Sequence, residues 1–235
     1  MKIKLSIILP VFNEVYNLKK LLQNWDLALK KKKFFNYEFV IVEDGSTDGT
    51  KELIKELCKK FRINNLSQTK RRGYSRAIVD GIYKSQGQFI LCVDSDNQIR
   101  VNSLINNINK LPKKNFFVIG QRNPRRDPTV RLLYSRLFKI FYDFLFKNKL
   151  HDPSCPFVIG HKADFIKLSK KKLLLTREAF WWGFVAIAIK KKFQFNEIKI
   201  KHYYRTAGIS GYNFFDLPKI IFKNTIAMLK IRFIN

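Results

Sequence analysis

Short apolar runs alternate with amphipathic stretches along the first half of the chain. The apolar runs predict buried strands over residues 6–11, 39–42, 89–93 and 116–120. Between them, apolar residues recur at three- and four-residue spacing, which predicts helices over residues 17–29, 50–61, 75–84 and 101–111. This alternation is typical of an α/β fold in which helices cover both faces of a mostly parallel central sheet.

The pattern changes after Arg122. A polar loop is followed by a predicted amphipathic helix from about residue 130 to 146, a turn over 151–156 and an apolar segment around Trp181. Trp181 and Trp182 either line an apolar groove or fill the core, and we favour the core. At 235 residues the chain fits one large domain, so we expect a single site.

The tail over residues 214–234 mixes large apolar residues with Lys219, Lys223, Lys230 and Arg232. That mixture is typical of an amphipathic helix lying at a membrane surface. A last helix that only packs on the core explains it equally well. No segment reaches the roughly 18 apolar residues of a spanning helix, so we expect any membrane contact to be peripheral.

Lys and Arg number 46 against 18 Asp and Glu, which gives a formal net charge of +28 at pH 7. Such an excess attracts polyanions, including nucleic acid, an anionic membrane and diphosphate substrates. A drift in base composition is an equally good explanation of much of it. No recognisable nucleic-acid-binding motif accompanies the charge, so we expect no specific nucleic-acid partner. Three cysteines without the paired spacing of zinc or disulfide sites favour a reducing, cytoplasmic compartment.

Acidic residues follow two of the predicted strands. Glu43 and Asp44 end one run, and Asp94 and Asp96 follow another. Because carboxylates that converge at one sheet edge repel each other, they need cations or hydrogen-bond donors, which favours a ligand site over chance. In Asp94-Ser95-Asp96, one carboxylate can engage a sugar while the other binds a hard divalent ion, and Gln98 can add a neutral oxygen.

Three motifs occur in a specific order: IILPVFNE at residues 7–14, VEDGSTDGT at 42–50 and DSDNQ at 94–98. Together they resemble the family-2 glycosyltransferases of the GT-A fold, and most closely the polyprenyl-phosphate branch typified by dolichol-phosphate mannose synthase. Later matches to that branch are Arg131 with Ser135, the turn over 152–157, and Arg205 with Gly208 and Ser210. The resemblance divides the domain into a nucleotide-sugar half (1–122), an acceptor half (123–213) and the amphipathic tail (214–235).

The resemblance also implies roles for individual residues. The nucleotide would be held by Pro10, Val11, Asn13, Glu14 and Asp44. Asp94 and Ser95 would face the donor, and Mg²⁺ or Mn²⁺ would be held by Asp94, Asp96 and Gln98. Phosphates would be contacted by Arg122, Arg131, Ser135 and Arg205, because a guanidinium fork binds phosphate oxygens in pairs. The catalytic set would be Asp96, Arg131, Ser135 and Arg205.

The activity implied is inverting, metal-dependent transfer of a sugar from a nucleotide diphosphate sugar to a polyprenyl phosphate at the cytoplasmic membrane face. The alternative acceptor is a saccharide or lipid-linked oligosaccharide of an envelope polymer. No acidic residue near Trp182 matches a general base, which favours a phosphate acceptor because phosphate is already ionised. Two departures from the family pattern are Glu43, where Asp is commoner, and Pro156, where the branch usually has Gly.

Overall fold

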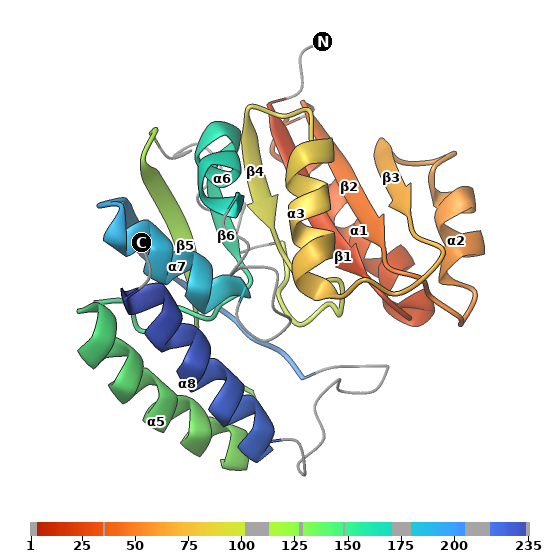
Figure 1. Cartoon of the computed structure of the whole chain (residues 1–235). Coiled ribbons are helices and arrows are strands. Elements are labelled where there is room, and N and C mark those ends of the chain that lie inside the picture. The colour runs from red at the N-terminus through yellow and green to blue at the C-terminus, as the bar shows by residue number, and fades with distance from the viewer. Residues whose placement is uncertain are drawn as a thin grey trace.

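The computed structural model of the chain describes residues 4–34, 36–101, 113–126, 129–147, 149–170, 180–204 and 217–233. Across these residues, seven strands form one sheet in the order β3-β2-β1-β4-β6-β5-β7 (Figure 1). The strands are β1 Leu5–Val11, β2 Tyr37–Glu43, β3 Ile63–Ser67, β4 Phe89–Cys92, β5 Phe116–Arg122, β6 Val158–His161 and β7 Gln194–Ile200.

Most neighbouring strands run parallel. The pairs β1/β2, β1/β4, β2/β3 and β5/β7 are parallel, and only β6 runs antiparallel to its neighbours β4 and β5. Strands β1, β2 and β4 are buried along their whole length, as expected for parallel strands covered on both faces. The predicted mostly parallel sheet is therefore confirmed.

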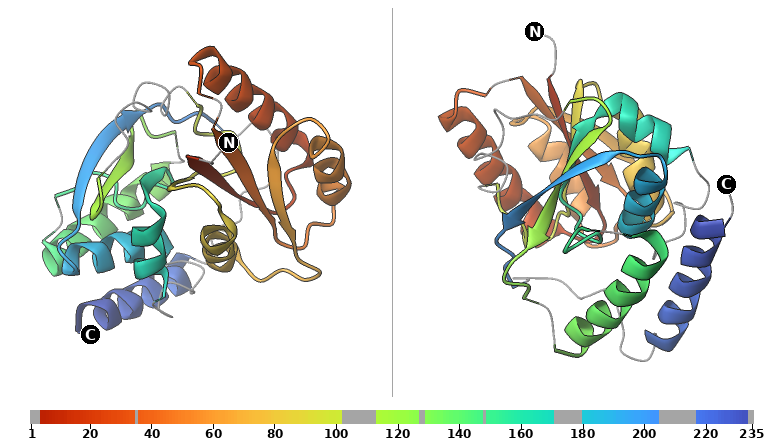
Figure 2. Two further views of the ribbon diagram at one scale, coloured as in Figure 1. Left: turned by 90° about the horizontal axis from the view of Figure 1, so that it is seen from above. Right: turned by 90° about the vertical axis from the view of Figure 1, so that its left-hand side faces the viewer.

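Helices cover both faces of the sheet. Helix α1, with α2 against it, lies on one face, and α3, α6 and α7 lie on the other (Figure 2). Helices α5 and α8 lie side by side and pack against α7 (Figures 1 and 2). The helices are α1 Val15–Lys31, α2 Thr50–Leu57, α3 Tyr74–Lys84, α5 Thr129–Phe146, α6 Lys162–Ser169, α7 Phe180–Lys190 and α8 Leu217–Phe233.

Three strands were not predicted from the sequence. Strand β3 reads INNLS and β7 reads QFNEIKI, and both lack a continuous apolar run because they are the two edge strands of the sheet. Strand β6 is only four residues long. The helix predicted over residues 101–111 falls almost entirely on residues 102–112, which lie outside the described part of the chain.

A cluster of aromatic rings forms the core of the second half. The Phe117 ring on β5 lies 5.2 Å from the ring centroids of both Phe165 and Phe184. Gly160 on β6 faces the same ring, and a Cβ atom there would lie 2.3 Å from two of the Phe117 ring carbons. The close packing of β6 against β5 therefore requires glycine at this position.

We expect Gly160→Ala to destabilise the fold by about 1–3 kcal/mol, because the added methyl group overpacks the Phe117 ring. For a domain of this size, each kcal/mol lowers the melting temperature by about 2–4 °C. Phe117→Leu makes room for the methyl group. Calorimetry of both single variants and the double variant should therefore show a combined loss smaller than the sum of the two. Simple additivity would contradict the packing argument.

Candidate active site

The ends of β1, β2 and β4 are joined by hydrogen bonds. The hydroxyl group of Ser95, buried just after β4, donates to the Pro10 carbonyl oxygen at 2.7 Å. The backbone N–H of Asp44, just after β2, donates to the Val11 carbonyl oxygen at 2.9 Å. Four of the predicted substrate-binding residues therefore meet at one edge of the sheet, where ligands of open α/β sheets bind.

The loop after β1 interlocks with the turn after β2. Asn13 has a positive φ of 55°, its backbone N–H donates to the Ser46 hydroxyl at 3.0 Å, and its side-chain oxygen accepts from Thr47 N–H at 2.9 Å. Glu14 N–H donates to the Thr50 hydroxyl at 3.0 Å. The first two sequence motifs thus build a single structural unit at the start of α1.

Backbone amides compensate the charges of Glu43 and Asp44. Ser46 N–H donates to the buried Glu43 carboxylate. The two carboxylate oxygens of Asp44 accept from Arg72 N–H at 2.7 Å and Gly73 N–H at 2.8 Å. These carboxylates therefore fix the turns beside the site, and the predicted contact of Asp44 with a nucleotide base remains a prediction.

The surroundings of Asp94, at the same edge, shift its pKa upward. Burial raises its pKa to about 7, and the charges of Asp96 and Glu14 act in the same direction. The hydrogen bond from the Tyr74 hydroxyl, at 2.6 Å, and the charge of Arg122 oppose the rise. Tyr74 could not be identified from the sequence, because nothing in the α3 pattern separates it from a core aromatic residue.

The segment after β7 lies against the loop that follows Asp96. Gln98 N–H donates to the Asp96 carboxylate at 3.1 Å, and the Gln98 side-chain amide donates to the Tyr203 carbonyl oxygen at 3.0 Å. Tyr203 N–H donates in return to the Gln98 carbonyl oxygen at 3.0 Å. His202 is buried, and its Nδ1 accepts from Arg126 N–H at 3.1 Å. The acceptor half therefore holds the predicted metal-binding loop in place.

Arg122 lies in a buried ion pair that the sequence did not predict. Its Nε lies 2.6 Å from Asp152 Oδ2, its second guanidinium nitrogen lies 2.8 Å from Asp152 Oδ1, and Ser154 accepts a further bond. Burial alone would raise the pKa of Asp152, but the charge and hydrogen bonds of Arg122 lower it to about 2. Glu197 holds this turn through Asp152 N–H at 2.8 Å. A phosphate contact by Arg122 remains a prediction.

The remaining predicted catalytic residues belong to the second half. Ser135 lies half-buried on α5. The side chain of Arg131 and the whole of Arg205 lie outside the described residues, so their roles remain predictions. Trp181 and Trp182 are both buried, which confirms the preference for the core.

The donor atoms at the edge suit a hard cation. No group of three or more His, Cys, Asp or Glu side chains that could hold a metal ion occurs among the described residues. Mg²⁺ commonly uses only one or two carboxylates and takes its other oxygens from water and substrate phosphates. The mutual repulsion that raises the pKa of Asp94 beside Asp96 is the repulsion that a divalent cation would remove. These two carboxylates, with the amide oxygen of Gln98, therefore fit such an ion.

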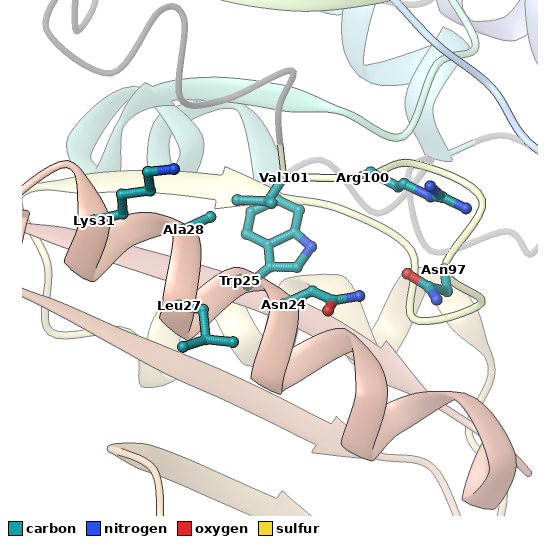
Figure 3. Close-up of a pocket in the computed structure, with 8 residues that line it drawn as sticks. All are labelled: Asn24, Trp25, Leu27, Ala28, Lys31, Asn97, Arg100 and Val101. Carbon is teal, nitrogen blue, oxygen red and sulfur yellow. The ribbon is translucent and has the colours of Figure 1, made fainter.

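A cavity of about 360 Å³ lies on the α1 side of the same loop (Figure 3). Its lining comes from the second half of α1, including Trp25 and Lys31, and from Asn97, Arg100 and Val101. None of the predicted site residues lines it. We therefore place the candidate active site at the ends of β1, β2 and β4 and not in this cavity.

Comparisons with known proteins found related sequences. The sequence model of glycosyl transferase family 2 matches residues 6–174. A dolichol-phosphate mannosyltransferase of Pyrococcus furiosus is 37% identical over 95 residues, covering 40% of this chain and 26% of that protein. A dolichyl-phosphate beta-glucosyltransferase of Trichomonas vaginalis is 26% identical over 220 residues, covering 85% of this chain and 66% of that protein. The chain thus spans at most about two thirds of these relatives.

A solved structure shows the same fold. It is the glucosyl-3-phosphoglycerate synthase of Mycobacterium tuberculosis, in complex with Mn²⁺, UDP-glucose and phosphoglyceric acid. It matches with a TM-score of 0.67 and 14% identity over 99% of this chain and 80% of that one. The predicted GT-A fold is therefore confirmed.

We expect Asp94→Asn to raise the melting temperature of the metal-free protein, and to raise it more at pH 8 than at pH 5. An unfolded chain releases this proton near pH 4, whereas the folded protein releases it only near pH 7. The ionised carboxylate therefore destabilises the metal-free fold increasingly as the pH rises through this window. Each kcal/mol recovered corresponds to about 2–4 °C.

Asp48→Asn is the matched control for this measurement. Burial alone would raise the pKa of Asp48, but hydrogen bonds from Thr50 and Val15 hold it below its ordinary value. Its ionised form therefore stabilises the fold, and the Asn variant should melt at a lower temperature at pH 8. The assignment of Asp94 as an uncompensated carboxylate is wrong if both variants melt lower.

Proposed function

The chain belongs to glycosyl transferase family 2, and from this we propose that it transfers a sugar from a nucleotide diphosphate sugar to a polyprenyl phosphate. The observation that carries the proposal is the Asp94–Asp96 pair at the ends of the parallel strands, where burial and the neighbouring Asp96 raise the pKa of Asp94 and a cation would stabilise its ionised form. The names of the relatives, which include dolichol- and dolichyl-phosphate glycosyltransferases, support the lipid phosphate as acceptor.

The loops after β1 and β2 would hold the nucleotide, and Asp94 would accept a hydrogen bond from the donor sugar. Asp96 and Gln98, with Asp94, would hold Mg²⁺ or Mn²⁺, which neutralises the charge that develops on the departing diphosphate. Arg122, Arg131 and Arg205 would contact phosphate groups. A single in-line attack by an ionised lipid phosphate needs no general base and inverts the anomeric configuration.

We expect the wild-type protein, incubated with lipid extract and a panel of nucleotide sugars, to form a glycosylated polyprenyl phosphate that mass spectrometry detects. EDTA should stop the reaction, and Mg²⁺ or Mn²⁺ should restore it. Asp96→Ala should lower the rate about 100-fold or more with little change in melting temperature, because Asp96 lies at a strand end outside the core.

Asp26→Ala is the control, since this carboxylate pairs with Lys30 on α1, away from the site. It should keep the wild-type rate. An Asp96→Ala variant with normal metal-dependent turnover would remove Asp96 from the proposed role. A glycosylated saccharide in place of a lipid product would establish the alternative acceptor.

We further propose that the protein attaches peripherally to a membrane through helices α5 and α8. Each helix exposes large apolar side chains at three- and four-residue spacing, which places them on one face. On α5 they are Leu133, Leu137, Ile140 and Phe144, and on α8 they are Phe222, Ile226, Leu229 and Phe233. Phe144 is 81% and Phe222 is 67% exposed.

The charges of α8 fit an anionic surface. Lys219, Lys223, Lys230 and Arg232 are exposed on this helix, and each basic residue near an anionic membrane contributes about 1 kcal/mol. Met228 and Ile231 of the same helix are buried against the body of the protein. One face of helix α8 therefore packs on the protein, and another face stays exposed and can meet a membrane surface. None of the helices described is long and apolar enough to cross a bilayer.

Liposome flotation tests this attachment. We expect the wild-type protein to float with anionic liposomes and to be released by high salt, because the basic residues act through screened charge. Replacing Leu137 and Phe144 on α5, or Phe222 and Phe233 on α8, with Ser should weaken flotation. Leu27→Ser, which removes an equally exposed apolar side chain from α1, should not. Equal flotation of all variants would contradict a role for the two helices.

A further inference from the structure

Tyr74 connects Asp94 to a tryptophan in the other half of the chain. Its hydroxyl group lies 2.6 Å from Asp94 Oδ1, and the Trp181 Nε1 lies 2.7 Å from the same hydroxyl oxygen. Tyr74 is the first residue of α3 and Trp181 the second residue of α7, 107 positions apart in sequence. A hydrogen-bonded row of three side chains therefore runs from Asp94, at the edge of the sheet, into the core of the second half.

The chemistry of the three groups fixes the direction of these bonds. An indole N–H only donates, so the Tyr74 oxygen must accept from Trp181. The single hydroxyl proton of Tyr74 is then available to Asp94, whose ionised form is acceptor-only. Donation from a hydroxyl group to a charged oxygen is stronger than a neutral hydrogen bond. Trp181 thus orients the hydroxyl group, and the hydroxyl group in turn holds one oxygen of Asp94.

Both ends of this row are held by further contacts. The Asp44 carboxylate binds the N–H groups of Arg72 and Gly73, which directly precede Tyr74. On the other side, the Trp182 carbonyl oxygen accepts from the Tyr142 hydroxyl of α5 at 2.8 Å. Trp181 and Tyr142 are buried. A shift of the start of α3 or of α7 would therefore break hydrogen bonds, of which the one between Tyr142 and Trp182 is buried.

We propose that Tyr74, oriented by Trp181, is a positioning residue that holds the Asp94 carboxylate for recognition of the donor sugar. Tyr74 engages Oδ1, so the sugar is held through Oδ2. This inference rests on the proposed function, because it takes the ligand to be a nucleotide diphosphate sugar. The loops after β1 and β2 would hold the nucleotide, and Asp96 and Gln98 would hold the metal without help from Tyr74. Loss of the Tyr74 hydroxyl should therefore weaken binding of the sugar more than binding of the diphosphate.

The test compares the Kd of a nucleotide sugar with that of its nucleoside diphosphate. The probes are UDP-glucose against UDP and GDP-mannose against GDP, measured by titration calorimetry in Mg²⁺ with the full chain. For the pair that the wild type binds, Tyr74→Phe should raise the Kd of the nucleotide sugar about 10-fold and leave that of the diphosphate within about twofold. A general loosening of the fold would weaken both ligands together.

Tyr37→Phe is the matched control. The Tyr37 hydroxyl also donates to a carboxylate, that of Asp26 at 2.5 Å, but on α1 and away from the strand ends. This variant should leave both Kd values at the wild-type level. Trp181→Phe removes the indole N–H that orients Tyr74, together with part of a buried ring, and it should weaken sugar binding in the same selective way. If Tyr74→Phe does not fold, the Trp181→Phe variant tests the proposal in its place.

A double variant gives the decisive comparison. In an Asp94→Asn background, Tyr74→Phe should change the Kd of the nucleotide sugar much less than it does in the wild type, because both changes act through one carboxylate. Equal changes in the two backgrounds, or equal weakening of sugar and diphosphate, would overturn the inference. Normal nucleotide-sugar binding without any transfer to lipid would overturn the proposed function alone. Binding of no nucleotide sugar by the wild type would overturn both.

Discussion

Negative charge gathered at the carboxyl ends of β1, β2 and β4 must be balanced, and the loops of the first half are arranged around that requirement. Parallel strands that end together bring the residues after them to one edge. The backbone amides before α3 balance Asp44, and a guanidinium balances Asp152 in the adjoining turn. Burial and the neighbouring Asp96 raise the pKa of Asp94, although the Tyr74 hydroxyl donates to it. A cationic or hydroxyl-bearing ligand would stabilise the ionised form of this carboxylate.

The sequence predicted the buried strands of the first half and the sheet edge at which the residues after them meet, because both depend on short-range patterns. Buried parallel strands are continuous apolar runs, and the residues after them follow from the order of the strands. The hydrogen-bond partners of the site residues could not be predicted in this way. Tyr74, Asp152 and Trp181 act through contacts between residues 20 to 107 positions apart, and nothing in their own neighbourhoods distinguishes them. Strands β3 and β7 were not predicted because edge strands of a sheet lack a continuous apolar run.

The division into a nucleotide-sugar half and an acceptor half remains a prediction, and the two parts of the chain share one sheet. Strand β6, from the second half, lies between β4 and β5 and pairs antiparallel with both. The loop carrying Asp94 and Asp96 therefore leaves the sheet beside a strand of the second half. Gln98 and Tyr203 extend this contact beyond the strands. We therefore expect that a substitution in the second half of the chain can shift the loop that carries Asp94 and Asp96.

The row from Asp94 to Trp181 also gives the protein an internal optical reporter. The chain has three tryptophans, and Trp181 is the one bonded to the hydroxyl group that binds Asp94. Trp25 is buried on α1, and Trp182 accepts a hydrogen bond from Tyr142 through its backbone carbonyl oxygen. Indole emission depends on the hydrogen bonding and polarity around the ring. We therefore expect the fluorescence of Trp181 to respond when a ligand changes the hydrogen bonding of Asp94, without any label attached to the protein.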